Sequence, residues 1–427
     1  MDNINELFEF IKKCPSPYHT VQTLKSELLN NGHTELFEGE AWNIENGKSY
    51  FVIRGGSSVI AFKARNSKNS FMIAASHSDS PAFKVKSSLE LQGAYTRLDT
   101  ERYGGMIHYS WLDRPLSIAG RVVIKEEDGI SVRTVDVARP IAVIPSVAIH
   151  FNRSVNDGYK FNPTSDLLAL VGDADSSSGV MDEIAAPLGV SKDKIISHDL
   201  FLYNADEGKS FGIKDEFIVS PRLDNLVSVF ASYKAYFAAE EGNSIPVLAV
   251  FDSEEVGSLT QNGAESGFLF DTLSRIAGSD YTKMIANSFL ASVDNAHAIH
   301  PNHPELSDAK NAPVLNGGIA VKWNAMRKYT TDAVSDAIFK TVCERVGVKV
   351  QSYSNRQDIP GGSTLGAIAN ASVPAISVDI GIPQLAMHSA SETAGREDVF
   401  ALIKALTELY SSSIVKSGDK ISISKEK

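Results

Sequence analysis

The chain has 427 residues, 43% of them hydrophobic, so it is long enough to bury the cores of two domains. Its formal charge is −11 with both signs mixed along the chain, which argues against nucleic acid as a partner. The only two cysteines, Cys14 and Cys343, lie far apart, so neither a disulfide framework nor a cysteine zinc site is predicted.

The first residues lack the basic start and apolar run of a secretory signal. The longest apolar runs, such as 245–251, are too short to span a bilayer. We therefore expect a soluble, cytoplasmic protein without a membrane partner.

Apolar residues recur at helical spacing before the prolines at 15–17 and again up to the turn at 30–32, so two short helices open the chain. Strands are predicted next at 50–53, 59–64 and 71–77. The last of these is apolar throughout, as expected for a central strand buried on both faces.

Residues 86–215 have a different pattern, with short alternating strands joined by polar turns and few helical stretches. Beyond residue 220, helical patterns alternate again with apolar strands. The sequence thus predicts an α/β fold with a mixed, largely parallel sheet covered by helices on both faces. One domain, formed by residues 1–85 and 216–427, is interrupted by a β-rich insert at 86–215.

Five polar clusters follow the apolar strands or lie beside them, where open α/β sheets place their ligand sites. In the first, His77 ends a strand and Asp79 follows two residues later. His77 is a candidate metal ligand, and Asp79 can accept the other ring N–H and orient the imidazole. A strand-end histidine beside a turn aspartate is the alternative interpretation of this pair.

The second cluster, SPRLDN at 220–225, precedes a helical stretch. Asp224 either caps that helix or, because a carboxylate has two oxygens, bridges two cations. The third cluster places Glu254 and Glu255 directly after the strand 245–251. Adjacent side chains in extended backbone point to opposite sides, so one glutamate should bind metal while the other faces the attacking water.

The last two clusters provide Asp294, after the strand 291–294, and His388, in a loop after the strand 375–381. A loop histidine alone is more often a surface residue, but here it completes a set of two histidines and four carboxylates. Mixed nitrogen and oxygen ligands suit zinc, cobalt or manganese. We expect two divalent ions per chain, most simply zinc.

Nine motifs occur in the order typical of the M18 metallopeptidases, the aspartyl aminopeptidase-like family, and the chain resembles that family over nearly its whole length. They are CPSPYHT at 14–20, SHSDSP at 76–81, RYGG at 102–105, IPSVAIHFNR at 144–153, SPRLDN at 220–225, FDSEEVGS at 251–258, SVDNAHAIHPN at 292–302, DIPGGST at 358–364 and DIGIPQLAMHS at 379–389.

The resemblance implies a zinc-peptidase catalytic domain interrupted by an insert for oligomerisation. It also implies the ligand sets and the general base: His77, Asp224 and Asp294 hold one ion; Asp224, Glu255 and His388 hold the other; Glu254 is the base. Members of the family assemble as dodecamers, and the resemblance implies that His150 reaches a neighbouring subunit's active site.

The expected reaction is removal of the amino-terminal residue from peptide substrates, with Glu254 taking the proton of the attacking water and His150 or an ion stabilising the oxyanion. Lys322 is the candidate for recognising an acidic first residue, with a surface ion pair as the alternative. The stretch 316–329 around it, NGGIAVKWNAMRKY, departs from the form usual in the family.

Two other functions remain open on the residues alone. A two-metal deacylase or carboxypeptidase could use the same core, although the RYGG and IPSVAIHFNR motifs favour the aminopeptidase. An inactive metal-binding scaffold could keep the fold, although such proteins typically lose the base or a ligand.

Overall fold

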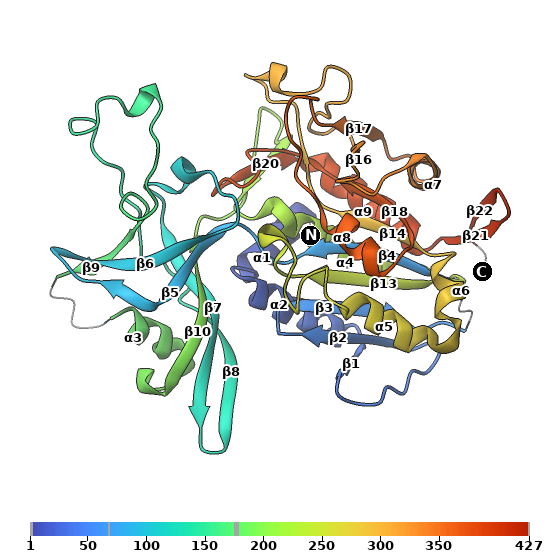
Figure 1. Cartoon of the computed structure of the whole chain (residues 1–427), viewed down its shortest axis with the longest axis horizontal. Coiled ribbons are helices and arrows are strands. Elements are labelled where there is room, and N and C mark those ends of the chain that lie inside the picture. The colour runs from blue at the N-terminus through green and yellow to red at the C-terminus, as the bar shows by residue number, and fades with distance from the viewer. Residues whose placement is uncertain (1–2, 67–68, 175–178, 426–427) are drawn as a thin grey trace.

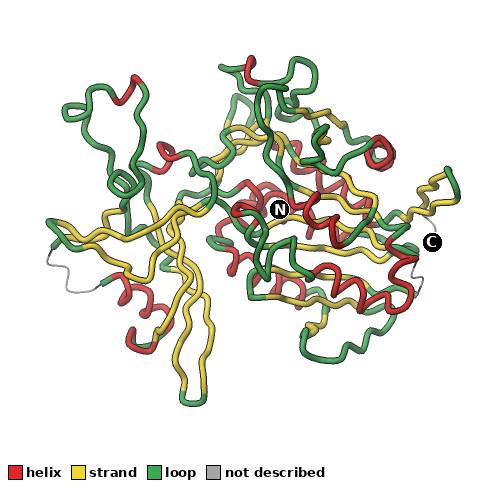
Figure 2. Tube along the Cα trace, in the orientation of Figure 1, coloured by secondary structure: helices red, strands yellow, loops and turns green. Residues whose placement is uncertain are grey.

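The computed structural model describes residues 3–66, 69–174 and 179–425. Figure 1 shows an α/β part with its helices on the right and a β-rich part on the left. The secondary-structure colouring in Figure 2 separates the same two parts, because most of the helices surround one sheet. The predicted fold class is confirmed: a mixed sheet with helices on both faces, interrupted by a β-rich insert.

The α/β part contains a nine-stranded sheet whose four central strands, β13, β4, β14 and β18, are all parallel to one another. Its strands, in spatial order, are β1 (Thr34–Leu36), β2 (Ser49–Arg54), β3 (Ser58–Lys63), β13 (Ile245–Phe251), β4 (Phe71–His77), β14 (Phe289–Val293), β18 (Ile376–Gly381), β16 (Ile319–Trp323) and β17 (Val350–Ser354).

Helices cover both faces of this sheet. One face packs against α1 (Asn3–Lys13), α2 (Pro17–Asn30), α4 (Leu223–Ala238), α7 (Ala333–Arg345) and α9 (Arg396–Tyr410). The other packs against α5 (Phe268–Ala277), α6 (Tyr281–Ile285) and α8 (Leu365–Ser372).

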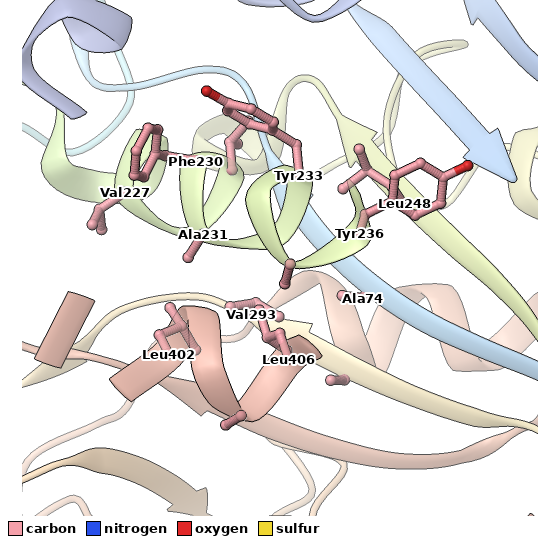
Figure 3. Close-up of a cluster of buried hydrophobic side chains, with 14 of the residues drawn as sticks. Ala74, Val227, Phe230, Ala231, Tyr233, Tyr236, Leu248, Val293, Leu402 and Leu406 are labelled. Carbon is pink, nitrogen blue, oxygen red and sulfur yellow. The ribbon is translucent and has the colours of Figure 1, made fainter. Parts of the chain in front are cut away.

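Strand β4 shows why a central strand is apolar throughout. Met72 and Ala74 join the core under α4 and α9, whereas Phe71, Ile73 and Ala75 join the core on the opposite face. Successive side chains of a strand point to opposite faces, so every position of β4 is buried. Figure 3 shows the first of these cores, with Leu402 and Leu406 of α9 turned toward α4.

The insert is an antiparallel six-stranded sheet with its own apolar core. Its strands, in spatial order, are β8 (Gly129–Asp136), β7 (Leu116–Glu126), β10 (Ile195–Asn204), β5 (Ala82–Leu91), β6 (Tyr95–Tyr103) and β9 (Ala169–Asp173). The short helix α3 (Val180–Ala185) packs against it.

A third, five-stranded sheet joins segments that are distant in sequence. Its order is β11 (Lys209–Phe211), β12 (Phe217–Ser220), β20 (Glu392–Gly395), β19 (Pro383–Leu385) and β15 (Ala296–His297). A hairpin of β21 (Ser413–Ser417) and β22 (Lys420–Ser424) follows α9. Among the described residues, no helix is both long and apolar enough to cross a membrane.

Candidate metal centre

The candidate ligands meet at the carboxyl edge of the four parallel strands. His77 is the last residue of β4 and pairs with Phe251, the last residue of β13. Val293, which precedes Asp294, pairs with Ile380 near the end of β18. Side chains that follow these strand ends therefore lie at one edge of the sheet, as expected for the ligand site of an open α/β sheet.

His77, Asp224 and Asp294 form the first group that could hold a metal ion. His77 Nε2 lies 3.5 Å from Asp224 Oδ1 and 3.6 Å from Asp294 Oδ1. Two ligand atoms at zinc-bond distance on a tetrahedral ion are separated by about 3.4 Å. The spacing in this group therefore fits one shared zinc-sized ion.

Asp224, Glu255 and His388 form the second group. His388 Nε2 lies 3.6 Å from Asp224 Oδ2 and 3.4 Å from Glu255 Oε2. Asp224 thus presents Oδ1 to His77 and Oδ2 to His388. A carboxylate placed in this way can bridge two cations.

Backbone carbonyls orient both histidine rings. His388 Nδ1 donates to Gly105 O at 2.7 Å, and His77 Nδ1 donates to Asp79 O at 3.1 Å. Because a carbonyl can only accept, the proton lies on Nδ1 in each ring. The Nε2 atom of each ring then carries the free lone pair that binds a metal ion.

The alternative role of Asp224 as a helix cap is wrong. Asp224 and Asn225 have non-helical backbone at a kink in the first turn of α4, and no hydrogen bond from a backbone N–H to the Asp224 carboxylate occurs among the described residues. Asp224 Oδ1 is buried and has no hydrogen-bond partner in the described part of the chain, and the same holds for Glu255 Oε1. A buried carboxylate oxygen without a partner is costly unless a cation compensates it.

Negative charge is in excess at this edge. Burial, together with the neighbouring Asp224, raises the pKa of Glu255 well above its usual value. Burial also raises the pKa of Glu254 to about 8, although His77 opposes the shift. Glu254 also lies in a third candidate group with His77 and Glu255. The donor set therefore fits divalent cations, with Glu254 beside them.

Asp79 makes more contacts than the sequence pattern indicated. Its carboxylate accepts hydrogen bonds from Tyr103 Oη at 2.9 Å and from the backbone N–H groups of Glu254 and Glu255 at 3.1 Å each. Its Oδ1 also lies 3.4 Å from His77 Nδ1. Asp79 therefore connects the end of β4 to the glutamate turn η5 (Glu254–Val256).

Lys322 lies in the interior with only 2% of its surface exposed, so the surface ion pair is excluded. Its ammonium donates to Asp294 Oδ2 and to Asn295 O, at 3.1 Å each. Burial raises the pKa of Asp294, but Lys322 and His77 outweigh it and hold that pKa below its usual value.

His150 is not brought to this cluster within one chain. It lies in an exposed loop of the insert between β8 and β9. That loop, which carries the short helix η2 (Val155–Asp157), extends away from the nine-stranded sheet in Figure 1.

The sequence analysis missed Glu392, which lies at the start of β20 with 2% exposure and contacts the backbone of two candidate ligands. A single glutamate in a four-residue strand carries no periodic signal. Tyr103, the partner of Asp79, belongs to the RYGG motif, but the motif did not indicate its contact.

Comparison with known proteins identifies the family of the chain. The family model described as "Aminopeptidase I zinc metalloprotease (M18)" matches residues 10–410. The chain belongs to the M18 family. It is therefore a metalloaminopeptidase, and the deacylase, carboxypeptidase and inactive-scaffold alternatives are not supported.

Its relatives include two proteins named "Probable M18 family aminopeptidase 2". That of Clostridium novyi is 40% identical over 423 residues, covering 95% of this chain and 98% of the relative. That of Clostridium acetobutylicum is 42% identical over 422 residues, with the same coverage of 95% and 98%.

Solved structures also match the M18 chain. It is similar to a chain in the cryo-EM structure of the Ape4 and Nbr1 complex, with 34% identity, a TM-score of 0.91 and coverage of 95% of this chain and 84% of that one. It is also similar to the S. cerevesiae mApe1 dodecamer, with 28% identity, a TM-score of 0.83 and coverage of 96% of each chain.

Proposed function

We propose that this M18 aminopeptidase hydrolyses the amino-terminal peptide bond at a centre of two zinc ions that share Asp224. The observation that carries the proposal is the position of the Asp224 carboxylate, with one oxygen 3.5 Å from His77 Nε2 and the other 3.6 Å from His388 Nε2. Asp294 completes the first ligand group and Glu255 the second.

When bound, such ions polarise a peptide carbonyl and lower the pKa of water toward neutrality. Glu254 accepts a proton from the attacking water and donates it to the leaving nitrogen. Two backbone N–H bonds to Asp79 hold the turn that carries Glu254, so its carboxylate keeps its place beside the ligands.

The test is a comparison of Glu254→Gln with Glu265→Gln, which makes the same chemical change at an exposed position. We expect Glu254→Gln to retain two zinc ions per chain and to lose about 10²–10⁴-fold in kcat. Glu265→Gln should keep both. A wild-type protein with one zinc ion, or a Glu254→Gln variant of normal turnover, would contradict the proposal.

We infer that Lys322 favours substrates with an acidic first residue. An ammonium has three donors, and two of them are used by Asp294 and Asn295. The third remains for a substrate carboxylate. Peptides that begin with Asp, Asn or Leu would test this inference, because Lys322→Met should reduce kcat/KM for Asp more than for Leu.

We also propose that the insert at 86–215 serves assembly and that the loop around His150 reaches a neighbouring subunit. Val147, Ile149 and Phe151 flank His150 with exposures of 55%, 47% and 88%. So much exposed apolar surface in one loop is typical of an interface. The similarity to the mApe1 dodecamer supports assembly of this chain into an oligomer.

A further inference from the structure

A buried carboxylate joins the kinked first turn of α4, which carries Asp224, to the loop that carries His388. Glu392 Oε2 accepts a hydrogen bond from the backbone N–H of Asp224 at 2.8 Å. Glu392 Oε1 accepts one from the backbone N–H of His388 at 2.7 Å. The side chain is 2% exposed, and no ion pair to it occurs in the described part of the chain.

The strand pairing places Glu392 between these two segments. In the third sheet it is paired with Ser220, the last residue of β12, and Asp224 follows four residues later. His388 lies in the turn between β19 and β20, which Glu392 closes. Arg222, just before α4, and His388 have left-handed backbone, with φ of 56° and 66°, and the backbone of Asp224 is non-helical. Both ligand segments are therefore irregular, and Glu392 hydrogen-bonds to each of them.

Two buried amides extend the connection to the third ligand segment. Gln384 Nε2 donates to Glu392 Oε1 at 3.3 Å, and Gln384 Oε1 accepts from Asn295 Nδ2 at 2.7 Å. Asn295 Nδ2 also donates to Leu223 O at 3.1 Å. Since Asn295 follows Asp294, one polar chain links the segments of three candidate ligands.

We propose that Glu392 is a positioning residue that sets the distance between the Asp224 carboxylate and the His388 imidazole, and thereby the zinc affinity of the Asp224, Glu255 and His388 group. The inference rests on the proposed two-ion centre. A buried carboxylate without an ion pair is costly, and the two backbone hydrogen bonds that Glu392 accepts both come from residues that carry candidate ligands. Groups that orient metal ligands typically change metal affinity by about 10–100-fold when removed.

Glu392→Gln is the sharpest perturbation because it preserves shape. An amide has one acceptor oxygen, so it can accept from only one of the two backbone N–H groups, and its own N–H₂ faces the other. We expect the affinity for the second zinc ion to fall about 10–100-fold, with a smaller change for the first.

Asp398 provides the matched control. It is 1% exposed, accepts from the backbone N–H of Asn316 at 2.6 Å and of Gly318 at 2.8 Å, and belongs to no candidate metal group among the described residues. Asp398→Asn therefore loses, like Glu392→Gln, one side-chain acceptor for a backbone N–H, but in a segment that carries no candidate ligand. It should lower thermal stability but leave both zinc affinities unchanged.

The experiment titrates zinc into the metal-free full chain against a chromogenic chelator, which reads affinity without activity. Selective weakening of the second site in Glu392→Gln supports the proposal. Wild-type affinities in that variant, or equal losses in Asp398→Asn, would overturn it. If Glu392→Gln does not fold, Gln384→Met is the second variant; it removes the bond of 3.3 Å to Glu392 and the bond of 2.7 Å from Asn295. It should weaken the second site in the same direction, and an unchanged affinity there overturns the proposal.

Zinc stoichiometry of the wild type separates this inference from the proposed function. If the wild-type chain binds a single ion, the two-ion centre fails on that measurement alone. If it binds two and Glu392→Gln binds both normally, only the role of Glu392 fails.

Discussion

Replacing Lys322 by methionine should destabilise the metal-free protein far more than the zinc-loaded protein. The change keeps most of the apolar stem and removes the ammonium that lies 3.1 Å from Asp294 Oδ2. Removing one partner of a buried ion pair costs about 3–5 kcal/mol, because the remaining charge is uncompensated. Zinc bound to Asp294 supplies that compensation, so the deficit should shrink when zinc is present.

The assay is the thermal midpoint of each protein in chelator and in zinc. A loss of this size corresponds to a drop of about 5 °C in a chain of this length. We expect that drop in chelator and less than half of it in zinc. The zinc-induced rise of the midpoint should therefore be larger in Lys322→Met than in the wild type.

Lys48→Met is the control, since Lys48 forms an exposed pair with Glu45 at 2.8 Å. An exposed pair of this kind contributes little to stability, so the midpoint should barely move. If Lys322→Met behaved like Lys48→Met in chelator, the buried pair would not contribute to stability. If zinc left the deficit unchanged, Asp294 would not be a ligand.

Three further predictions follow from the same contacts. Asp224→Ala should lose zinc from both groups, and metal analysis that finds one ion fully retained would indicate separate, unbridged sites. Mixing inactive His150→Ala with inactive Glu254→Gln chains under conditions of subunit exchange should restore partial activity, whereas no rescue after proven exchange would place His150 outside a neighbour's site. Burial lowers the pKa of His33 to about 4 beside Tyr236, with which it shares a hydrogen bond of 3.0 Å. As pH falls from about 6.5 to 4, the histidine of the unfolded chain takes up its proton before that of the folded chain, so the free energy of unfolding should decline. In denaturant titrations, His33→Gln should remove at most about 2 kcal/mol of that decline, a figure that allows for solvent screening.

Much of the candidate site could be predicted because its chemistry follows local patterns. The apolar run that ends in His77 predicts a buried strand, and so does the run that ends in Phe251, shortly before two glutamates. Polar residues at the ends of buried strands indicate a functional site. Parallel strands bring such ends to one edge, so sequence position indicated that these side chains would gather there. The division of the ligands into two groups came from the resemblance to the M18 family.

Other elements were missed for different reasons. Helix α9 carries a helical period in Val399, Leu402, Leu406 and Leu409, all buried, so its sequence contained the signal although the predicted elements stopped at the strand 375–381. The third sheet had no such signal, because β15, β19 and β20 have two to four residues each and are stabilised by pairing with distant segments.

The sequence by itself determined the kinds of ligand and the edge of the sheet at which they would gather. It left open whether Asp224 capped a helix or faced two cations, and whether Lys322 lay on the surface. Only the tertiary structure decided both, by placing the Asp224 carboxylate between His77 and His388 and by bringing Lys322 of β16 to Asp294. The physical reason is that the distance between two residues remote in sequence depends on how the strands pair and how the helices pack on them. A hydrophobic period of two or 3.6 residues predicts a strand or a helix, but it carries no information about which elements become neighbours.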